Sequence, residues 1–370
     1  MKFDHRHYVP CLRWKQGEYQ AVLRLPDTTK RVFMPLIEVP GIGWDFEEKK
    51  AKKTIDEHLD PFTKRVRKKW GNSPCFVDFN LIKTTERMEN GLHPVCFVFD
   101  GLREMQCSAI PVTGVDRDSA YQEEIKKILN KDNSGVCLRI KIEQAARSSV
   151  QEEVDSLLTA LGIQAVECDL ILDLGAPTNF VPLEGFSKAI QAIVNDLPYL
   201  NKWRTFTVLG TSFPKTMSGI KKGGEVVIRH EWQLYKMLVA GFRKAGLRLP
   251  TFGDYAINHP EIPELDWRVV KPSASIRYTI DDHWYIVKGD NVRDEKYGKF
   301  KQYRKLSRIV LDSRYYCDST FSWGDNYIQE CADGTGKTGH LPMWRQVGTN
   351  HHIEKVTQDI ASFYDSLNTF

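Results

Sequence analysis

Eight short apolar runs, most of them followed by a helix-like stretch, constrain the fold of this chain more than any other feature. They are rich in Val, Ile, Leu and Phe without strict alternation, which is typical of parallel strands covered on both faces. Strands that alternate with amphipathic segments indicate βαβ units, and eight such units predict a closed (β/α)₈ barrel. The runs are residues 8–15, 32–38, 74–79, 108–113, 135–141, 168–175, 204–212 and 250–256.

Amphipathic segments between these runs supply the helices that a barrel needs. Their apolar residues recur at helical spacing, as Ile55, Leu59 and Phe62 do, and Asp118 stands where the N-cap of one helix is expected. The predicted helices span residues 17–25, 46–69, 118–131, 143–161, 184–197 and 230–245.

The chain after the eighth run departs from the simple barrel pattern. A Pro-rich stretch is followed by a strong hairpin pattern at 275–289, a helix-like segment at 297–311 and a Gly-rich region at 320–349. Residues 351–367 have the spacing of a closing barrel helix, with Asn350 as its N-cap.

We therefore expect two parts, a barrel and an α+β insertion in the loop after strand eight. The barrel is expected to use residues 1–259 plus 350–370, and the insertion residues 260–349. Loops at this end of a barrel lie on its catalytic face, so the insertion is predicted to form a lid over the carboxyl-terminal mouth. A separate C-terminal domain is the alternative.

Composition indicates a cytoplasmic protein without a membrane segment. The net charge of +4 implies no strong field, and the basic run at 64–69 fits a solvated helix face better than a nucleic-acid patch. The eight cysteines form no CxxC pair, which favours free thiols in a reducing compartment. The N-terminal segment lacks a signal-peptide core, and no apolar run approaches the ~20 residues of a membrane span.

Polar residues cluster where the predicted strands end, on the face where barrels place their active sites. Four carboxylates among them predict an acid–base cluster or a site for Mg²⁺ or Mn²⁺, with Glu38, Asp78 and Asp173 as metal ligands. A buried ionic network without catalysis is the alternative. The strand-end residues are Lys15, Glu38, Asp78, Thr113, Arg139, Asp173, Thr211 and Asp254.

Further residues predict where a ligand would be held. Lys15 and Arg139 supply positive charge suited to phosphate, and Glu18 follows Gly17 at the first strand-to-helix turn. From the insertion and the last helix, Asp325, Arg345 and His352 are expected to approach the cluster, His352 as a general acid or base. The tract Gly334–Gly339 lacks the spacing of a phosphate loop, so we interpret it as a mobile loop.

Several motifs, taken in order, resemble the bacteriophage-associated beta protein family. At the start the resemblance rests on residues 8–10, 14–18, 35–38, 44–46 and 77–78. In the C-terminal part it rests on residues 274–278, 321–325, 344–345 and 350–352, which are the more specific motifs. It spans nearly the whole chain and implies a prokaryotic or phage origin, with relatives linked to mobile elements and anti-phage defence. It supplies no reaction.

The leading hypothesis is a defence-linked protein that binds a phosphate-containing ligand at the barrel mouth. Hydrolysis of this ligand is a further option within the same hypothesis. Such a ligand would be a nucleotide or a nucleic-acid end, and an enzyme of this kind would be a metal-dependent phosphodiesterase. The rival is a non-enzymatic sensor or adaptor that uses the barrel as a scaffold for a partner protein of a defence complex. The sequence does not indicate the oligomeric state.

Overall fold

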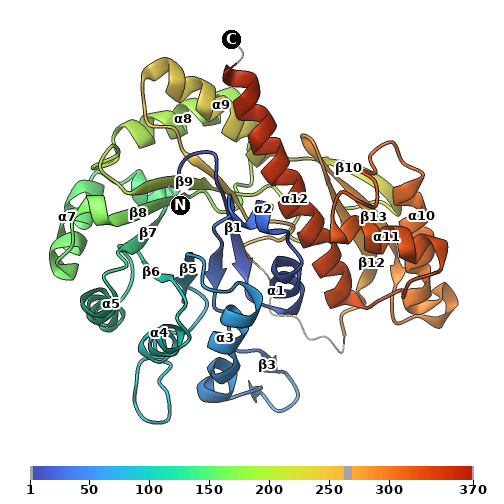
Figure 1. The fold of residues 1–370 in the computed structure, drawn as a ribbon, viewed down its shortest axis with the longest axis horizontal. Coiled ribbons are helices and arrows are strands. Elements are labelled where there is room, and N and C mark those ends of the chain that lie inside the picture. The colour runs from blue at the N-terminus through green and yellow to red at the C-terminus, as the bar shows by residue number, and fades with distance from the viewer. Residues whose placement is uncertain (1–2, 262–268, 369–370) are drawn as a thin grey trace. The chain divides into compact units, whose positions relative to one another are not determined.

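The computed structural model describes residues 3–261 and 269–368 (Figure 1). Their packing divides the chain into two compact units, each built from separate stretches of sequence. The first unit contains Met1–Trp14, Val32–Thr211 and Glu231–Asp254. The second contains Lys15–Arg31, Ser212–His230 and Tyr255–Phe370.

The first unit is a closed parallel barrel of eight strands, as the apolar runs predict. Each of the eight runs contributes one strand, and the strands are joined in the order β1-β11-β9-β8-β7-β6-β5-β2. Closure leaves no strand edge exposed. The strands are β1 (Tyr8–Arg13), β2 (Leu36–Glu38), β5 (Cys75–Asp78), β6 (Ala109–Thr113), β7 (Val136–Lys141), β8 (Cys168–Asp173), β9 (Thr205–Leu209) and β11 (Thr251–Asp254).

Helices of the first unit lie around these strands (Figure 1). Their buried faces are the predicted ones: Ile55, Leu59 and Phe62 are buried, and the Asp118 side chain caps its helix by accepting from the Tyr121 backbone N–H. The helices are α3 (Ile55–Lys69), α4 (Pro94–Glu104), α5 (Ser119–Asp132), α6 (Ile142–Ala145), α7 (Val150–Leu161), η1 (Ala165–Glu167), α8 (Leu183–Asn195) and α9 (His230–Ala245).

Two helix predictions in the barrel were wrong in their extent. The segment 46–69 becomes helical only at Ile55, because Thr54 and Glu57 form a capping box there. The residues before it form a small hairpin, β3 (Trp44–Asp45) with β4 (Lys50–Ala51). The segment 143–161 is split between α6 and α7, and α4 was not predicted.

The second unit is built on a three-stranded antiparallel sheet in the order β10-β13-β12. The predicted hairpin is confirmed, with Ile280 opposite His283 across a two-residue turn. The third strand, β10, comes from the loop after β9 and was not predicted. The elements are α1 (Gln16–Leu23), α2 (Asp27–Lys30), β10 (Gly223–Ile228), β12 (Ser273–Ile280), β13 (His283–Asn291), η2 (Glu295–Tyr297), η3 (Lys299–Gln302), α10 (Tyr303–Leu311), α11 (Trp323–Asp333) and α12 (Leu341–Asn368).

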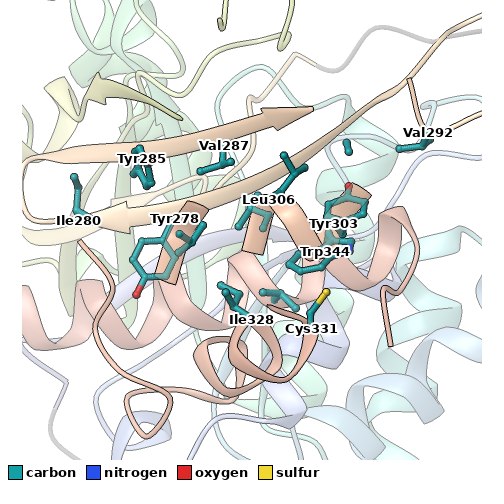
Figure 2. Packing of buried hydrophobic residues seen from close by; sticks show 14 residues of the cluster. Tyr278, Ile280, Tyr285, Val287, Val292, Tyr303, Leu306, Ile328, Cys331 and Trp344 are labelled. Carbon is teal, nitrogen blue, oxygen red and sulfur yellow. The ribbon is translucent and has the colours of Figure 1, made fainter. Parts of the chain in front are cut away.

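An aromatic and aliphatic core holds this sheet to the helices of its own unit. Figure 2 shows Tyr278 and Val287 of the sheet in the same cluster as Leu306 of α10 and Ile328 of α11. The Tyr303 and Trp344 rings stack with their centroids 4.3 Å apart. On the other strand face, Trp284 and Ile286 pack with Phe213, so β13 packs against apolar side chains on both of its faces.

The last helix is longer than predicted. It begins at Leu341, so Asn350 lies within α12 and its assignment as an N-cap was wrong. Asn350 instead accepts from the Gly324 backbone N–H at 2.9 Å and donates to the Ala21 carbonyl at 3.2 Å. The buried Trp344 and Val347 explain the early start, because they bind the first turns of α12 to the core.

The two units divide the chain differently from the expected 1–259 plus 350–370 and 260–349. Residues 350–370, expected in the barrel, group with the second unit, and so do 15–31 and 212–230. The reason is local packing, since α1 contacts α12 and β10 pairs with β13. Residues 262–268 of the expected insertion lie outside the described residues. A lid position over the mouth stays a prediction.

All eight cysteines are free thiols, and Cys11, Cys75 and Cys137 are buried in strands as expected. Across residues 3–261 and 269–368, every helix is too short or too polar to cross a lipid bilayer.

Candidate functional site

Arg139 occupies the centre of a group of carboxylates at the carboxyl end of the barrel. Its Nη1 lies 2.8 Å from Glu38 Oε1 and 2.8 Å from Asp78 Oδ2, and its Nη2 lies 2.7 Å from Asp173 Oδ2. These carboxylates are the last residues of β2, β5 and β8. The Arg139 side chain is only 7% exposed. One guanidinium therefore joins three strands far apart in the sequence.

Two further arginines complete the group. Arg117 Nη2 lies 2.6 Å from Asp78 Oδ1, and Arg13 Nε lies 3.6 Å from Glu38 Oε2. Three carboxylates thus meet three guanidiniums, and the formal charges cancel. We call this group the Arg139 cluster; its members are Arg13, Glu38, Asp78, Arg117, Arg139 and Asp173.

Strand register explains why these residues meet. Arg13, Glu38 and Asp78 are partners in the parallel ladder that runs through β1, β2 and β5. Residues at equal height in a parallel ladder put their side chains on the same face. Each of the three follows a buried apolar pair, so the barrel core fixes the height of the charged residues.

Electrostatics keep the Asp78–Arg117 ion pair charged. Burial raises the pKa of the Asp78 carboxyl, but the guanidiniums of Arg117 and Arg139 oppose this and leave that pKa below its ordinary value. Burial lowers the pKa of Arg117, whereas Asp78 raises it to a net value above the ordinary one. Asp78 also accepts from the Asn80 backbone N–H at 2.9 Å. Both partners of this ion pair are therefore charged at neutral pH.

The cluster does not fit a divalent cation. One oxygen of each expected ligand, Glu38, Asp78 and Asp173, faces the Arg139 guanidinium, which supplies the positive charge that a metal would bring. In the described part of the chain, no three His, Cys, Asp or Glu side chains are arranged to hold a metal ion. We therefore derive no chemical step through Mg²⁺ or Mn²⁺.

The other strand-end residues have other described partners. Asp254 is fully buried at the end of β11 and accepts from the Tyr8 hydroxyl at 2.5 Å. Thr113 Oγ1 donates to Gln122 Oε1 at 2.8 Å, and Thr211 is fully buried. Sequence reasoning missed Tyr8, Arg13 and Arg117. Arg13 ends β1, two residues before Lys15, which ends the predicted first run.

Lys15, Glu18 and Arg345 belong to the second unit. Glu18 is buried and accepts from Asn258 Nδ2 at 3.2 Å, while Asn258 Oδ1 accepts from Arg345. Burial raises the pKa of the Glu18 carboxyl, and the Arg345 charge opposes this only in part. Lys15 stands at the N-cap position of α1 with extended backbone. The structure thus joins two of the predicted binding residues through Asn258.

Arg277 lies in the same part of the second unit and was not predicted as a site residue. Its Nη1 donates to the Ile257 carbonyl at 2.7 Å, which Arg345 Nη1 also approaches at 3.4 Å. Burial, followed by the charge of Arg345, lowers the pKa of Arg277 well below its ordinary value. Arg277 lies in the motif 274–278 and Arg345 in the motif 344–345. The sequence alone does not show that these two motifs lie next to each other; the structure does.

Asp325 and the paired histidines form a buried network. Asp325 Oδ2 lies 2.8 Å from His351 Nδ1, and His351 Nε2 lies 2.8 Å from the Thr279 carbonyl. Both partners are hydrogen-bond acceptors, and the two ring nitrogens of His351 face them. His352 Nδ1 lies 2.8 Å from Thr279 Oγ1. Because all of these side chains are fully buried, this arrangement favours packing of α12 over contact with a ligand.

Comparison with known proteins supports the resemblance noted from the motifs. The model of the Beta protein family matches residues 8–358. The chain belongs to the Beta protein family. The matched residues include both units of this chain. A search of curated proteins finds no match.

Solved structures similar to this Beta protein are barrel enzymes. A mutant tryptophan synthase alpha-subunit from Pyrococcus furiosus is 10% identical, with a TM-score of 0.39, covering 69% of this chain and 89% of its own. Triosephosphate isomerase from Bartonella henselae is 12% identical, with a TM-score of 0.35 and coverages of 67% and 91%. An aldolase from Escherichia coli K12 is 6% identical, with a TM-score of 0.34 and coverages of 97% and 90%. Similarities this distant are not evidence for any particular activity of this chain.

Proposed function

We propose that this Beta protein is a non-enzymatic sensor or adaptor in anti-phage defence, with the barrel as its rigid scaffold. The observation that carries the proposal is the Arg139 guanidinium, which makes ion pairs with Glu38, Asp78 and Asp173. In barrel enzymes the strand ends of this face hold the catalytic groups. Here the charges at that position neutralise one another, which suits a structural closure of the barrel.

Protonation behaviour also argues against acid–base chemistry in the cluster. A general acid or base works best when its pKa lies near the working pH. The pKa of Asp78 moves below its ordinary value, away from neutrality, because Arg117 and Arg139 stabilise its charged form. A carboxylate held in this way is a poor proton carrier.

The defence role rests on the family. The resemblance implies relatives that are linked to mobile elements and anti-phage defence, and it supplies no reaction. An adaptor needs a partner protein, and we propose a component of the same defence system as that partner.

A phage-challenge experiment separates a scaffold from a catalytic barrel. Cells that carry the complete defence locus would be plated against a phage panel with the wild-type protein, with Glu38→Gln and with the exposed control Glu184→Gln. We expect both variants to protect as the wild type does. Because Glu38→Gln removes a buried charge, a thermal melt must first show that it folds, with Asp173→Asn as the substitute if it does not.

A thermal-shift panel with Mg²⁺, Mn²⁺ and nucleotides provides the biochemical test. A ligand that binds only the native state raises its stability by about 2.7 kcal/mol at 100 times its Kd. We expect no stabilisation that requires metal and nucleotide together. Metal-dependent stabilisation that disappears in a folded Glu38→Gln variant, with loss of protection in the same variant, would overturn the scaffold proposal.

A second candidate is binding of a phosphate group at the Arg139 cluster without turnover. Arg117 favours it, because its side chain is 19% exposed and its contact with Asp78 uses only one edge of the guanidinium. Guanidiniums bind phosphate oxygens in pairs. Stabilisation by inorganic phosphate that Arg117→Gln removes and Arg147→Gln retains would favour this candidate.

A further inference from the structure

A surface cavity in the second unit has a strongly basic lining. Its volume is about 710 Å³, and it lies between the start of α10 and the segment 336–340. Lys301 and Arg304 line one side, and Lys337 and His340 line the other. Cavities of this size accommodate small molecules. The cavity lies outside the Arg139 cluster, since every residue that lines it belongs to the second unit.

The charge of this cavity is not neutralised. All four titratable residues of its lining are basic, and Lys301, Arg304 and Lys337 make no salt bridge with any described residue. Of the neighbouring carboxylates, Asp333 pairs with Arg308 at 2.9 Å, whereas Glu330 accepts from the neutral Asn326 amide at 3.0 Å and so offsets only one of the three Lys and Arg charges. The cavity thus differs from the Arg139 cluster, where each guanidinium faces a carboxylate. Concave sites with one sign of charge concentrate ions of the opposite sign.

The backbone of the segment 336–340 is held close to the helices beneath it. A Cβ at Gly336 would lie 2.8 Å from Glu330 Cβ, so only glycine lets the chain pass there. Gly339 has a φ of +63°, which glycine adopts without strain. Trp344 Nε1 donates to the Thr338 carbonyl at 2.8 Å and ties the segment to the core. These contacts fix the position of the basic side chains on either side.

The same segment leads into the N-terminus of α12. This helix has 28 residues and no acidic residue in its first turn. The N-terminus of a long helix carries a partial positive charge and favours phosphate. His340, which lines the cavity, directly precedes this helix.

We infer that this cavity binds a small polyphosphate, such as the phosphate chain of a nucleoside triphosphate. Three Lys and Arg charges match the charge of two to three phosphate groups. Phe, Tyr and Trp are absent from the lining residues of this described cavity and His340 supplies its one ring, so successive bases of a nucleic-acid strand have no row of rings to stack on, and a strand is disfavoured. The inference is independent of the scaffold role of the barrel, because it involves none of the residues of the Arg139 cluster.

Calorimetric titration with tripolyphosphate tests the inference on the full-length protein. The test variant is the double substitution Arg304→Gln with Lys337→Gln, and both side chains are exposed, so the fold should persist. The matched control is Lys305→Gln, an exposed lysine of the same helix that does not line the cavity. We expect binding by the wild type, at least about tenfold weaker binding by the double variant, and a change below about twofold for the control.

Three outcomes would overturn the inference. The first is a wild-type protein that does not bind tripolyphosphate. The second is an equal loss in the Lys305→Gln control, which would show a diffuse surface charge in place of a site. The third is binding of a single-stranded oligonucleotide that the double variant abolishes while tripolyphosphate does not compete. Thermal melts of all variants confirm that each protein is folded.

Discussion

At the scale of single residues, the cost of burying charge decides what the Arg139 cluster does. Asp78 is completely buried and contacts two guanidiniums. An ion pair in such a place contributes little net stability, but removal of one partner leaves the other charge uncompensated. The two arginines around Asp78 therefore make this carboxylate the most sensitive position of the cluster.

We expect Asp78→Asn to lower the free energy of unfolding by about 3 kcal/mol, because Arg117 and Arg139 lose the charge that compensates them. Urea unfolding measures the change. The control is Asp116→Asn, whose side chain is 56% exposed and whose pair with Arg147 should contribute less than about 1 kcal/mol. Equal losses in the two variants would show that the cluster does not stabilise the barrel.

Acid should destabilise the second unit through Asp325. Burial raises the pKa of this carboxyl, yet His351 and the hydrogen bonds from Ser322 and Tyr278 outweigh burial and leave it below its ordinary value. A group with a lowered folded-state pKa stabilises the fold above its unfolded-state pKa of about 3.9 and loses that contribution as the pH falls further. We expect Tm to drop between pH 5 and pH 3 by more in the wild type than in Asp325→Asn. An equal drop in Tm for the wild type and for Asp325→Asn would contradict the stabilising role of the Asp325 carboxylate.

At the scale of elements, close approaches fix where helices can lie. Gly17 of α1 faces Arg345 of α12, and a Cβ there would lie 2.4 Å from Arg345 Cγ. Alanine normally favours a helix over glycine by about 1 kcal/mol, so this position reverses an ordinary preference. In the sequence, Gly17 is only a glycine next to a charged residue. Its role could not be predicted, because the helix that packs against it, α12, is more than 300 residues away.

Gly17→Ala should destabilise the second unit by about 1–3 kcal/mol, because the added methyl group forces α1 away from α12 or moves Arg345. Thermal melts provide the measurement. Gly219→Ala is the matched control in the same unit, since a Cβ there meets nothing within 4 Å. If Gly17→Ala and Gly219→Ala have the same Tm, the packing of α1 on α12 is looser than described.

Elements also show where sequence reasoning succeeds. All eight barrel strands were predictable because a buried parallel strand is a continuous local run of apolar residues. Strand β10 was missed because its residues alternate between partly buried and exposed, with no buried apolar run, and its partner β13 lies about 60 residues further on. The carboxylates of the Arg139 cluster were predictable as strand ends. Arg117 was not, because it lies in a loop whose path only the tertiary structure fixes.

At the scale of the whole molecule, the second unit is assembled from three stretches of chain. Strand β10 depends on the rest of the sheet, because it pairs only with β13 in the described sheet. Two-stranded and single-stranded remnants are not stable in water by themselves. The insertion expected from the sequence, 260–349, is therefore only part of a folding unit.

Deletion of 260–349 with a short flexible linker should leave residues 212–230 unfolded, because β10 loses its partner and Phe213 and Ile220 lose Trp284 and Ile286. Limited proteolysis followed by mass spectrometry should find new cuts within 212–230 in the deletion variant. The intact protein serves as the control. Protection of this stretch in the deletion variant would mean that β10 has another partner.

The packing of α1 against α12 has a consequence for synthesis on the ribosome. Roughly 320 residues separate the end of α1 at Leu23 from the start of α12 at Leu341. At about 5–20 residues per second, α1 waits roughly 15–65 s before its partner is translated. Seven of the eight barrel strands are made during this interval, because only β1 precedes α1, so α1 is expected to need chaperones that shield nascent chains.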